Sequence, residues 1–224
     1  MGTHITFKRP DGKETAGYLA NAARGNAPGV VVVQEWWGLS ENIKGLCDRF
    51  AVAGFDALAP DLYKGVVVPY HDTDAANAQM TSLDFIDATT QNVRGAAQYL
   101  ARNGAKVGLT GFCLGGAVTI IGATKISELT AGSGFCGIPP EQAAKPADVK
   151  IPLQAHFANK DDWCTPAAVD AFEKAMKAAG KSLELFRYDA EHAFVNEQRV
   201  AVHDRQAAEL AWGRATEFFR KHLG

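Results

Sequence analysis

The chain has 224 residues, 47% of them hydrophobic, which is enough for one well-buried domain spanning residues 1–224. Its 23 basic and 25 acidic side chains leave a formal net charge of -2, which argues against nucleic acid or an acidic membrane surface as a partner. No segment approaches the roughly eighteen consecutive apolar residues of a membrane-spanning helix.

The residue pattern in the first part of the chain predicts a hairpin followed by a strand–helix–strand unit. The elements expected there are strands at 3–8, 15–20 and 29–34, a helix from Ser40 to Ala53, and a strand at 55–59. Pro10-Asp11-Gly12 is typical of the turn in such a hairpin. Ser40 can cap the helix, and Gly54 can end it.

Strands and helices continue to alternate in the rest of the chain. We expect two helical pieces within 72–101, a strand at 106–110, a helix at 117–124, strands at 128–135 and 151–157, a helix from Pro166 to Ala179, a strand at 183–188, and an amphipathic helix ending near Leu223. Leu83, Phe85 and Ile86 are assigned to the first of the two helical pieces. This alternation predicts an α/β fold with a mostly parallel sheet covered by helices on both faces.

The sequence Gly111-Phe112-Cys113-Leu114-Gly115-Gly116 lies between a predicted strand and a predicted helix. Glycines flanking a central residue at this position are typical of a nucleophile elbow, a turn too tight for neighbouring Cβ atoms. Cys113 is the central residue, and its sulfur ionises more easily than the usual serine hydroxyl. Cys113 is therefore the candidate nucleophile, the alternative being a buried cysteine beside packing glycines.

A nucleophilic thiol needs a base or an ion-pair partner, and an imidazole needs a third group to orient it. Asp161 and Asp162 follow the strand at 151–157, and His192 follows the strand at 183–188. The order nucleophile, acid, histidine is that of α/β-hydrolases, whose sites lie at the carboxyl ends of the strands. His156, inside a predicted strand, is interpreted as a core residue.

Several segments together resemble the dienelactone hydrolase family of α/β-hydrolases. The matching segments are Gly111-Phe112-Cys113-Leu114-Gly115-Gly116, Gln34-Glu35-Trp36-Trp37-Gly38, Ala59-Pro60-Asp61-Leu62-Tyr63 and Glu191-His192-Ala193-Phe194. The resemblance implies an α/β-hydrolase fold, a Cys-His-Asp triad, and opening of an enol lactone through an acyl-thioester intermediate. Cys113 would attack the carbonyl, and His192 would transfer the proton.

The acid of the implied triad has two candidates. Counting from His156-Phe157 puts Asp161 at the family position, whereas counting back from Pro166 favours Asp162. We expect Asp161, and the other acid is then a solvated loop residue.

Three further residues are expected to act on the substrate or on the thiol. The backbone N–H groups of Leu114 and Trp36 are predicted to form the oxyanion hole. Glu35 follows a run of valines, where a buried carboxylate needs a partner or a task. The partner could be Arg49 or another base. The resemblance instead implies that Glu35 accepts a hydrogen bond from the Cys113 thiol and keeps it protonated until substrate binds.

The chain departs from the family pattern where the lactone carboxylate is bound. Residues 72–92 contain no Lys or Arg, and position 196, four residues after the histidine, is Asn. Arg94 and Arg199 could substitute from shifted positions, but Asn196 cannot form the charged fork that a carboxylate prefers. A different small ester or thioester is therefore the alternative substrate.

The remaining expectations concern the class of protein and its surroundings. The four cysteines, Cys47, Cys113, Cys136 and Cys164, show no pattern of a disulfide framework or zinc site, which fits a reducing cytoplasm. We expect a monomer that uses no metal or cofactor and whose partner is a small lactone or ester. A non-catalytic ligand-binding protein or a redox-thiol protein is the alternative from a different class.

Overall fold

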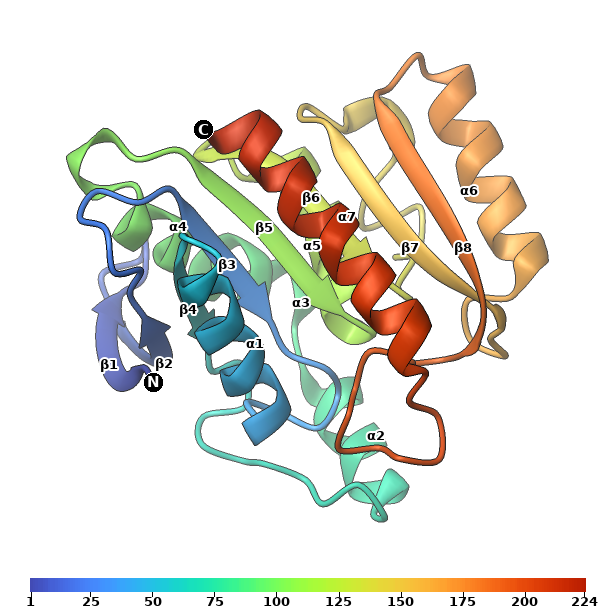
Figure 1. Ribbon diagram of the computed structural model, residues 1–224, viewed down its shortest axis with the longest axis horizontal. Helices are drawn as coiled ribbons and strands as arrows, with labels where there is room; N and C mark the ends of the chain where they lie inside the picture. The colour runs from blue at the N-terminus through green and yellow to red at the C-terminus, as the bar shows by residue number, and fades with distance from the viewer.

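A computed structural model describes residues 1–224, whose eight strands form one sheet in the order β1-β2-β4-β3-β5-β6-β7-β8 (Figure 1). β1 and β2 are antiparallel to each other and β2 is antiparallel to β4, whereas the remaining neighbours are parallel. The predicted α/β class with a mostly parallel sheet is confirmed, and the opening hairpin forms its antiparallel edge.

The strands are β1 Thr3–Lys8, β2 Glu14–Ala20, β3 Gly29–Val33, β4 Asp56–Pro60, β5 Val107–Phe112, β6 Leu129–Phe135, β7 Leu153–Lys160 and β8 Leu183–Glu191. The α-helices are α1 Glu41–Val52, α2 Thr73–Ser82, α3 Phe85–Asp87, α4 Arg94–Leu100, α5 Leu114–Lys125, α6 Pro166–Ala178 and α7 Arg205–Leu223. A π-helical segment, Ala88–Val93, joins α3 to α4, and short 3-10 turns occupy Arg102–Gly104 and Pro146–Asp148.

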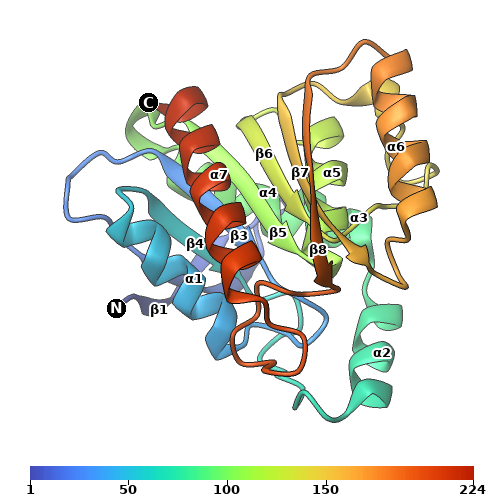
Figure 2. The ribbon, with the colours of Figure 1, turned by 45° about the vertical axis from the view of Figure 1, so that its right-hand side comes forward.

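Helices cover both faces of the sheet, as the sequence predicts. α1 and α7 lie on one face, and α4, α5 and α6 lie on the other (Figures 1 and 2). Val30 and Val32 of β3 pack in the core beneath α1 and α7, whereas Val31 and Val33 pack beneath α4 and α5. The uninterrupted valine run is therefore explained by a strand that is buried on both sides.

The carboxyl ends of the parallel strands meet at one edge of the sheet. α2 and the loop that follows β8 lie beyond this edge (Figure 2). Residues that directly follow β3, β5, β7 and β8 are consequently brought together, although they are far apart in the sequence.

Several predicted boundaries were wrong by a few residues. β5 continues to Phe112 and α5 begins at Leu114, so that Cys113 alone separates strand from helix. β7 and β8 likewise extend to Lys160 and Glu191, because they continue to pair with each other beyond their most apolar residues.

The break within the predicted helical stretch 72–101 lies at Leu83–Asp84, so Phe85 and Ile86 belong to the second helical piece. The cause is Asp84, whose Oδ1 accepts hydrogen bonds from the N–H groups of Ile86 and Asp87 and caps the new helix.

None of the helices has both the length and the apolar character needed to cross a lipid bilayer.

Candidate active site

Cys113 occupies a sharp turn between β5 and α5. Its φ of 56° and ψ of −114° lie in a region that L-residues rarely adopt. The Cys113 N–H donates to Phe135 O at 2.9 Å, which ties the turn to β6. A Cβ atom on Gly111 would lie 2.1 Å from Gly115 O, and one on Gly115 would lie 2.5 Å from Val33 O. The turn therefore requires glycine at both flanking positions, as the motif predicts.

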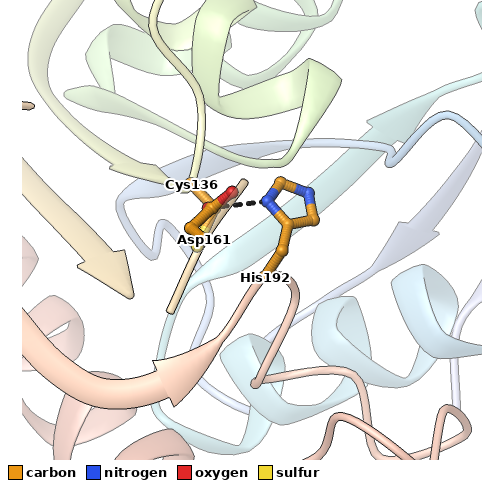
Figure 3. Close-up of side chains that lie close together, drawn as sticks. All are labelled: Cys136, Asp161 and His192. Carbon is orange, nitrogen blue, oxygen red and sulfur yellow. Dashed lines mark hydrogen bonds and ion pairs between the residues drawn. The ribbon is translucent and has the colours of Figure 1, made fainter. Parts of the chain in front are cut away.

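His192 and Asp161 directly follow β8 and β7, and their side chains are hydrogen-bonded. His192 Nδ1 lies 2.7 Å from Asp161 Oδ2 (Figure 3). Asp161 is buried, and its Oδ1 accepts hydrogen bonds from the N–H groups of Trp163 at 2.8 Å and Cys164 at 3.0 Å. Asp162 is exposed and makes no contact of this kind with His192. Of the two candidate acids, the structure thus brings Asp161 to the histidine.

The charges of these groups are coupled to that of Cys113. Burial alone would lower the pKa of His192, but the hydrogen bond with Asp161 and the interaction with the Cys113 sulfur raise it to about 10. Burial likewise opposes ionisation of Asp161, yet the contacts with His192 and the two N–H groups hold the pKa of this carboxyl below its ordinary value. The arrangement therefore favours an imidazolium at His192, next to the carboxylate of Asp161.

Cys113 and His192 line the same cavity, which has a volume of about 190 Å³. The residues around it come mainly from the carboxyl ends of the strands and from the loop after β8. They are Trp36, Met80, Cys113, Lys160, Asp162, Trp163, Glu191, His192, Arg199 and Val202. The sequence did not single out Met80, Lys160, Glu191 and Val202, because nothing in their type or spacing shows that they face one cavity.

Of the two predicted oxyanion donors, Trp36 lines this cavity and Leu114 directly follows Cys113 in the chain. Trp36 lines the cavity, and its backbone N–H donates to no backbone or side-chain oxygen of the protein. Leu114 is the first residue of α5, where the N–H has no acceptor within the helix. Both N–H groups are therefore available to an oxygen held near Cys113, and the positive end of the α5 dipole adds to the attraction.

Glu35 is buried, but it does not form the expected contact with Cys113. Its Oε2 accepts hydrogen bonds from the Asn196 side chain at 2.7 Å and from the Asn42 side chain at 3.5 Å, and its Oε1 has no partner. Arg49, the alternative partner, pairs with Glu209 instead. Burial raises the pKa of Glu35 to about 7, against the opposing effects of Arg199, Asn196 and His192.

Asn196 and Arg199 are the two polar residues considered for binding a substrate carboxylate, and they have different surroundings. Asn196 is fully buried and serves as the neutral hydrogen-bond partner of Glu35. Arg199 lines the cavity, and its guanidinium carbon lies 5.6 Å from the centroid of the Trp37 ring. None of the ion pairs of the protein involves Arg199. Arg94 is engaged elsewhere, with Glu128 at 3.0 Å. An arginine therefore lines the cavity, and it comes from position 199.

Cys136 is a second thiol near the site, and the sequence analysis did not assign it. Its sulfur, a carboxylate oxygen of Asp161 and a ring nitrogen of His192 lie within 4.8 Å of one another (Figure 3). Cys136 directly follows β6, and this position at the carboxyl end of a strand is the signal that could have located it.

The cluster of Cys136, Asp161 and His192 offers donor types that zinc accepts, but its geometry is that of a hydrogen bond. Two ligands of a tetrahedral zinc ion lie about 3.3 Å apart, whereas the imidazole and carboxylate atoms are 2.7 Å apart. Burial also raises the pKa of the Cys136 thiol well above its ordinary value. Cys136 lies in the hydrophobic core, whereas Cys113 faces the cavity, so Cys113 is the accessible thiol.

Three further ring side chains near the site belong to the core and not to the cavity. His156 is buried, with its ring nitrogens 2.8 Å from Tyr188 Oη and from Gln154 Oε1, as expected of a satisfied core residue. Trp37 and Phe194 are also buried and do not line the cavity.

Comparison with known proteins places this site in a family. Residues 15–223 match the model of the dienelactone hydrolase family. The chain is 34% identical to the usf protein of Aquifex pyrophilus over 234 residues that cover both chains completely, and 34% identical to a provisionally named carboxymethylenebutenolidase of Aquifex aeolicus with the same coverage.

A crystal structure of a provisionally named dienelactone hydrolase from Klebsiella pneumoniae is similar with a TM-score of 0.86 at 26% identity, covering 99% of this chain and 100% of that one. Since the match extends over nearly the whole length and includes the segments that build the cavity, the chain belongs to the dienelactone hydrolase family of α/β-hydrolases.

Proposed function

We propose that this protein is a cysteine-dependent hydrolase that opens a small enol lactone or a related ester through an acyl-thioester intermediate. The single observation that carries the proposal is the position of His192. Its ring is hydrogen-bonded to Asp161, it interacts electrostatically with Cys113, and it lines the same cavity as Cys113.

In the proposed first step, the Cys113 thiolate attacks the carbonyl carbon of the substrate. The N–H groups of Trp36 and Leu114 stabilise the negative oxygen of the tetrahedral intermediate. His192, held as an imidazolium by Asp161, gives its Nε2 proton to the departing oxygen, and the acyl group remains on Cys113. In a lactone the departing oxygen, now an enol, stays attached to the acyl chain.

In the second step, water replaces the leaving group. Neutral His192 accepts a proton from the water, whose oxygen attacks the thioester carbon. Collapse of the second tetrahedral intermediate breaks the carbon–sulfur bond, releases the carboxylic acid and restores the Cys113–His192 ion pair. Asp161 keeps the proton on Nδ1 throughout, so that Nε2 faces the reaction.

Arg199 supports a substrate that carries a carboxylate group. It reaches the cavity without an ion-pair partner, and a guanidinium binds a carboxylate through two parallel hydrogen bonds. The negative side chains of Asp162 and Glu191 line the same cavity. We therefore propose that a substrate carboxylate lies on the Arg199 side of the cavity, away from these two acids.

The proposal is tested with the Cys113→Ala variant. We expect it to fold as the wild type does, since alanine fits the space of a cysteine, and to lose at least about a thousandfold in kcat with lactone and ester substrates. Mass spectrometry of the wild type mixed with substrate should show an acyl adduct on the peptide that contains Cys113. A purified variant that keeps the wild-type rate would refute the assignment.

The Cys136→Ala variant is the matched control for a nearby thiol, and it should keep the acyl adduct on Cys113. A panel of lactones, aryl esters and thioesters then separates the enol lactone from the alternative substrates. A protein that binds these compounds without turnover would instead be a ligand-binding member of the family.

A further inference from the structure

Trp163 is a large aromatic side chain exposed to solvent at the rim of the cavity. It is 64% exposed, whereas Trp37 is 1% exposed and Trp36 is partly buried. The exposed part of such a ring is apolar surface in contact with water. A ligand that covers this surface gains the free energy of apolar burial. Its position therefore indicates a ligand-binding role.

The Trp163 ring is held in a defined place relative to the reacting groups. Its backbone N–H donates to Asp161 Oδ1 at 2.8 Å, which couples its position to the orientation of His192. Its ring meets that of Trp36 edge to face, with centroids 5.4 Å apart and an angle of 68°. The centroid of the His192 ring is 6.5 Å away. The Trp163 ring thus lies beside His192 and Trp36 at the cavity that Cys113 also lines.

The cavity has both apolar and charged lining residues. Trp36, Trp163, Met80 and Val202 are apolar, Arg199 and Lys160 are basic, and Asp162 and Glu191 are acidic. Lys160 is already paired with Asp189, so Arg199 is the basic side chain without an ion pair. The volume of about 190 Å³ suits a single six-membered ring, since cavities on the order of 150 Å³ accept benzene.

We propose that Trp163 is a specificity-determining residue that selects substrates in which a planar aromatic ring lies next to the ester or lactone carbonyl and carries, or is attached to, a carboxylate. The ring packs on the exposed side of Trp163 in an offset or edge-to-face arrangement, and the carboxylate lies toward Arg199. The inference rests on the proposed function for the identity of the reacting carbonyl, but ring binding is measurable without turnover.

The test compares two ligands that differ only in aromaticity. Benzoate and cyclohexanecarboxylate have the same charge and nearly the same size, and only benzoate has a π-system. Dissociation constants are measured by NMR titration for the wild type and for the Trp163→Ala, Trp163→Phe and Val200→Ala variants. Val200 is the matched control, because it is 85% exposed and does not line the cavity.

We expect Trp163→Ala to reduce the preference for benzoate over cyclohexanecarboxylate by roughly fivefold, the effect of losing one ring–ring contact. Trp163→Phe and Val200→Ala should keep the wild-type preference within about twofold. An unchanged preference in Trp163→Ala, or an equal loss in Val200→Ala, would overturn the inference. Turnover of lactones and aryl esters by the wild type tests the hydrolase proposal separately, so failure of the hydrolase proposal and failure of the ring-binding inference are seen in different measurements.

Discussion

At the scale of single residues, the site depends on which side chains lie at the ends of β5, β7 and β8. Cys113, Asp161 and His192 each follow one of these strands directly. The sequence predicted all three as site residues from their order and from the elbow motif. It left Asp161 and Asp162 as alternatives, because only the contact made by each carboxylate distinguishes two adjacent acids.

The first prediction concerns these two acids. Asp161→Asn should lower kcat/KM by about a thousandfold, because an amide cannot hold the Nδ1 proton of His192 in the required tautomer. Asp162→Asn, a change of the same kind one residue away, should keep the rate within about threefold. Steady-state kinetics with one ester substrate measures both. Equal losses in the two variants would contradict the assigned role of Asp161.

The second prediction concerns the pH dependence of the reaction. Since the pKa of His192 is raised to about 10, its imidazolium is present at neutral pH and is lost only in strongly basic solution. A plot of kcat/KM against pH should accordingly fall above about pH 10. In Asp161→Asn this fall should move to lower pH, because one of the groups that raise the pKa is removed. A basic limb near pH 7 in the wild type would contradict this account.

At the scale of secondary structure, the strand–turn–helix unit around Cys113 is the element that positions the proposed nucleophile. The motif predicted the turn, but the predicted strand was too short and the predicted helix started too late. The reason is that Gly111, Gly115 and Gly116 weaken the local signal for both strand and helix around Cys113. Their conformation is decided by the pairing of β5 with β6 and by the close approach of Gly115 to Val33.

The third prediction tests this close approach. Gly111→Ala should destabilise the protein by about 2–4 kcal/mol, because the new Cβ would lie 2.1 Å from Gly115 O, which is a backbone atom and cannot move aside cheaply. Gly45→Ala is the matched control. Gly45 is an exposed residue of α1 with no atom near the added Cβ, so the change should stabilise by about 0.5–1 kcal/mol. Urea unfolding measures both, and a tolerated Gly111→Ala would show that the turn can relax.

At the scale of the whole molecule, the site joins segments that are distant in the sequence around the buried carboxyl group of Glu35. Asn196 reaches it from the loop after β8, and Asn42 reaches it from α1. The expected thiol contact is replaced by these two amides. The raised pKa of Glu35 links this tertiary arrangement to the stability of the fold.

The fourth prediction is the resulting dependence of stability on pH. Glu35 has an ordinary pKa of 4.5 and a folded-state pKa of about 7, so the folded protein binds the proton more tightly than the unfolded chain does. The contribution of Glu35 to the free energy of unfolding is fully present below about pH 4.5 and is lost as the pH rises to about 7. This change is on the order of 3 kcal/mol.

Glu35→Gln carries no titrating proton, and its free energy of unfolding relative to that of the wild type should therefore increase across this range. Urea unfolding between pH 4.5 and pH 8 measures the difference, and Glu141→Gln, at an exposed position, is the control. Parallel curves for Glu35→Gln and the wild type would contradict the coupling.

The sequence by itself determined the alternation of strands and helices, the elbow with Cys113 and the order of acid and histidine, because these depend on local periodicity and on residue types at fixed spacing. Only the tertiary structure decided that Asp161 contacts His192, that Asn196 and not Cys113 bonds to Glu35, and that Arg199 and Trp163 face the cavity. The physical reason is that the direction of a loop side chain depends on contacts with segments far away in the chain, and no local pattern of residues encodes those contacts.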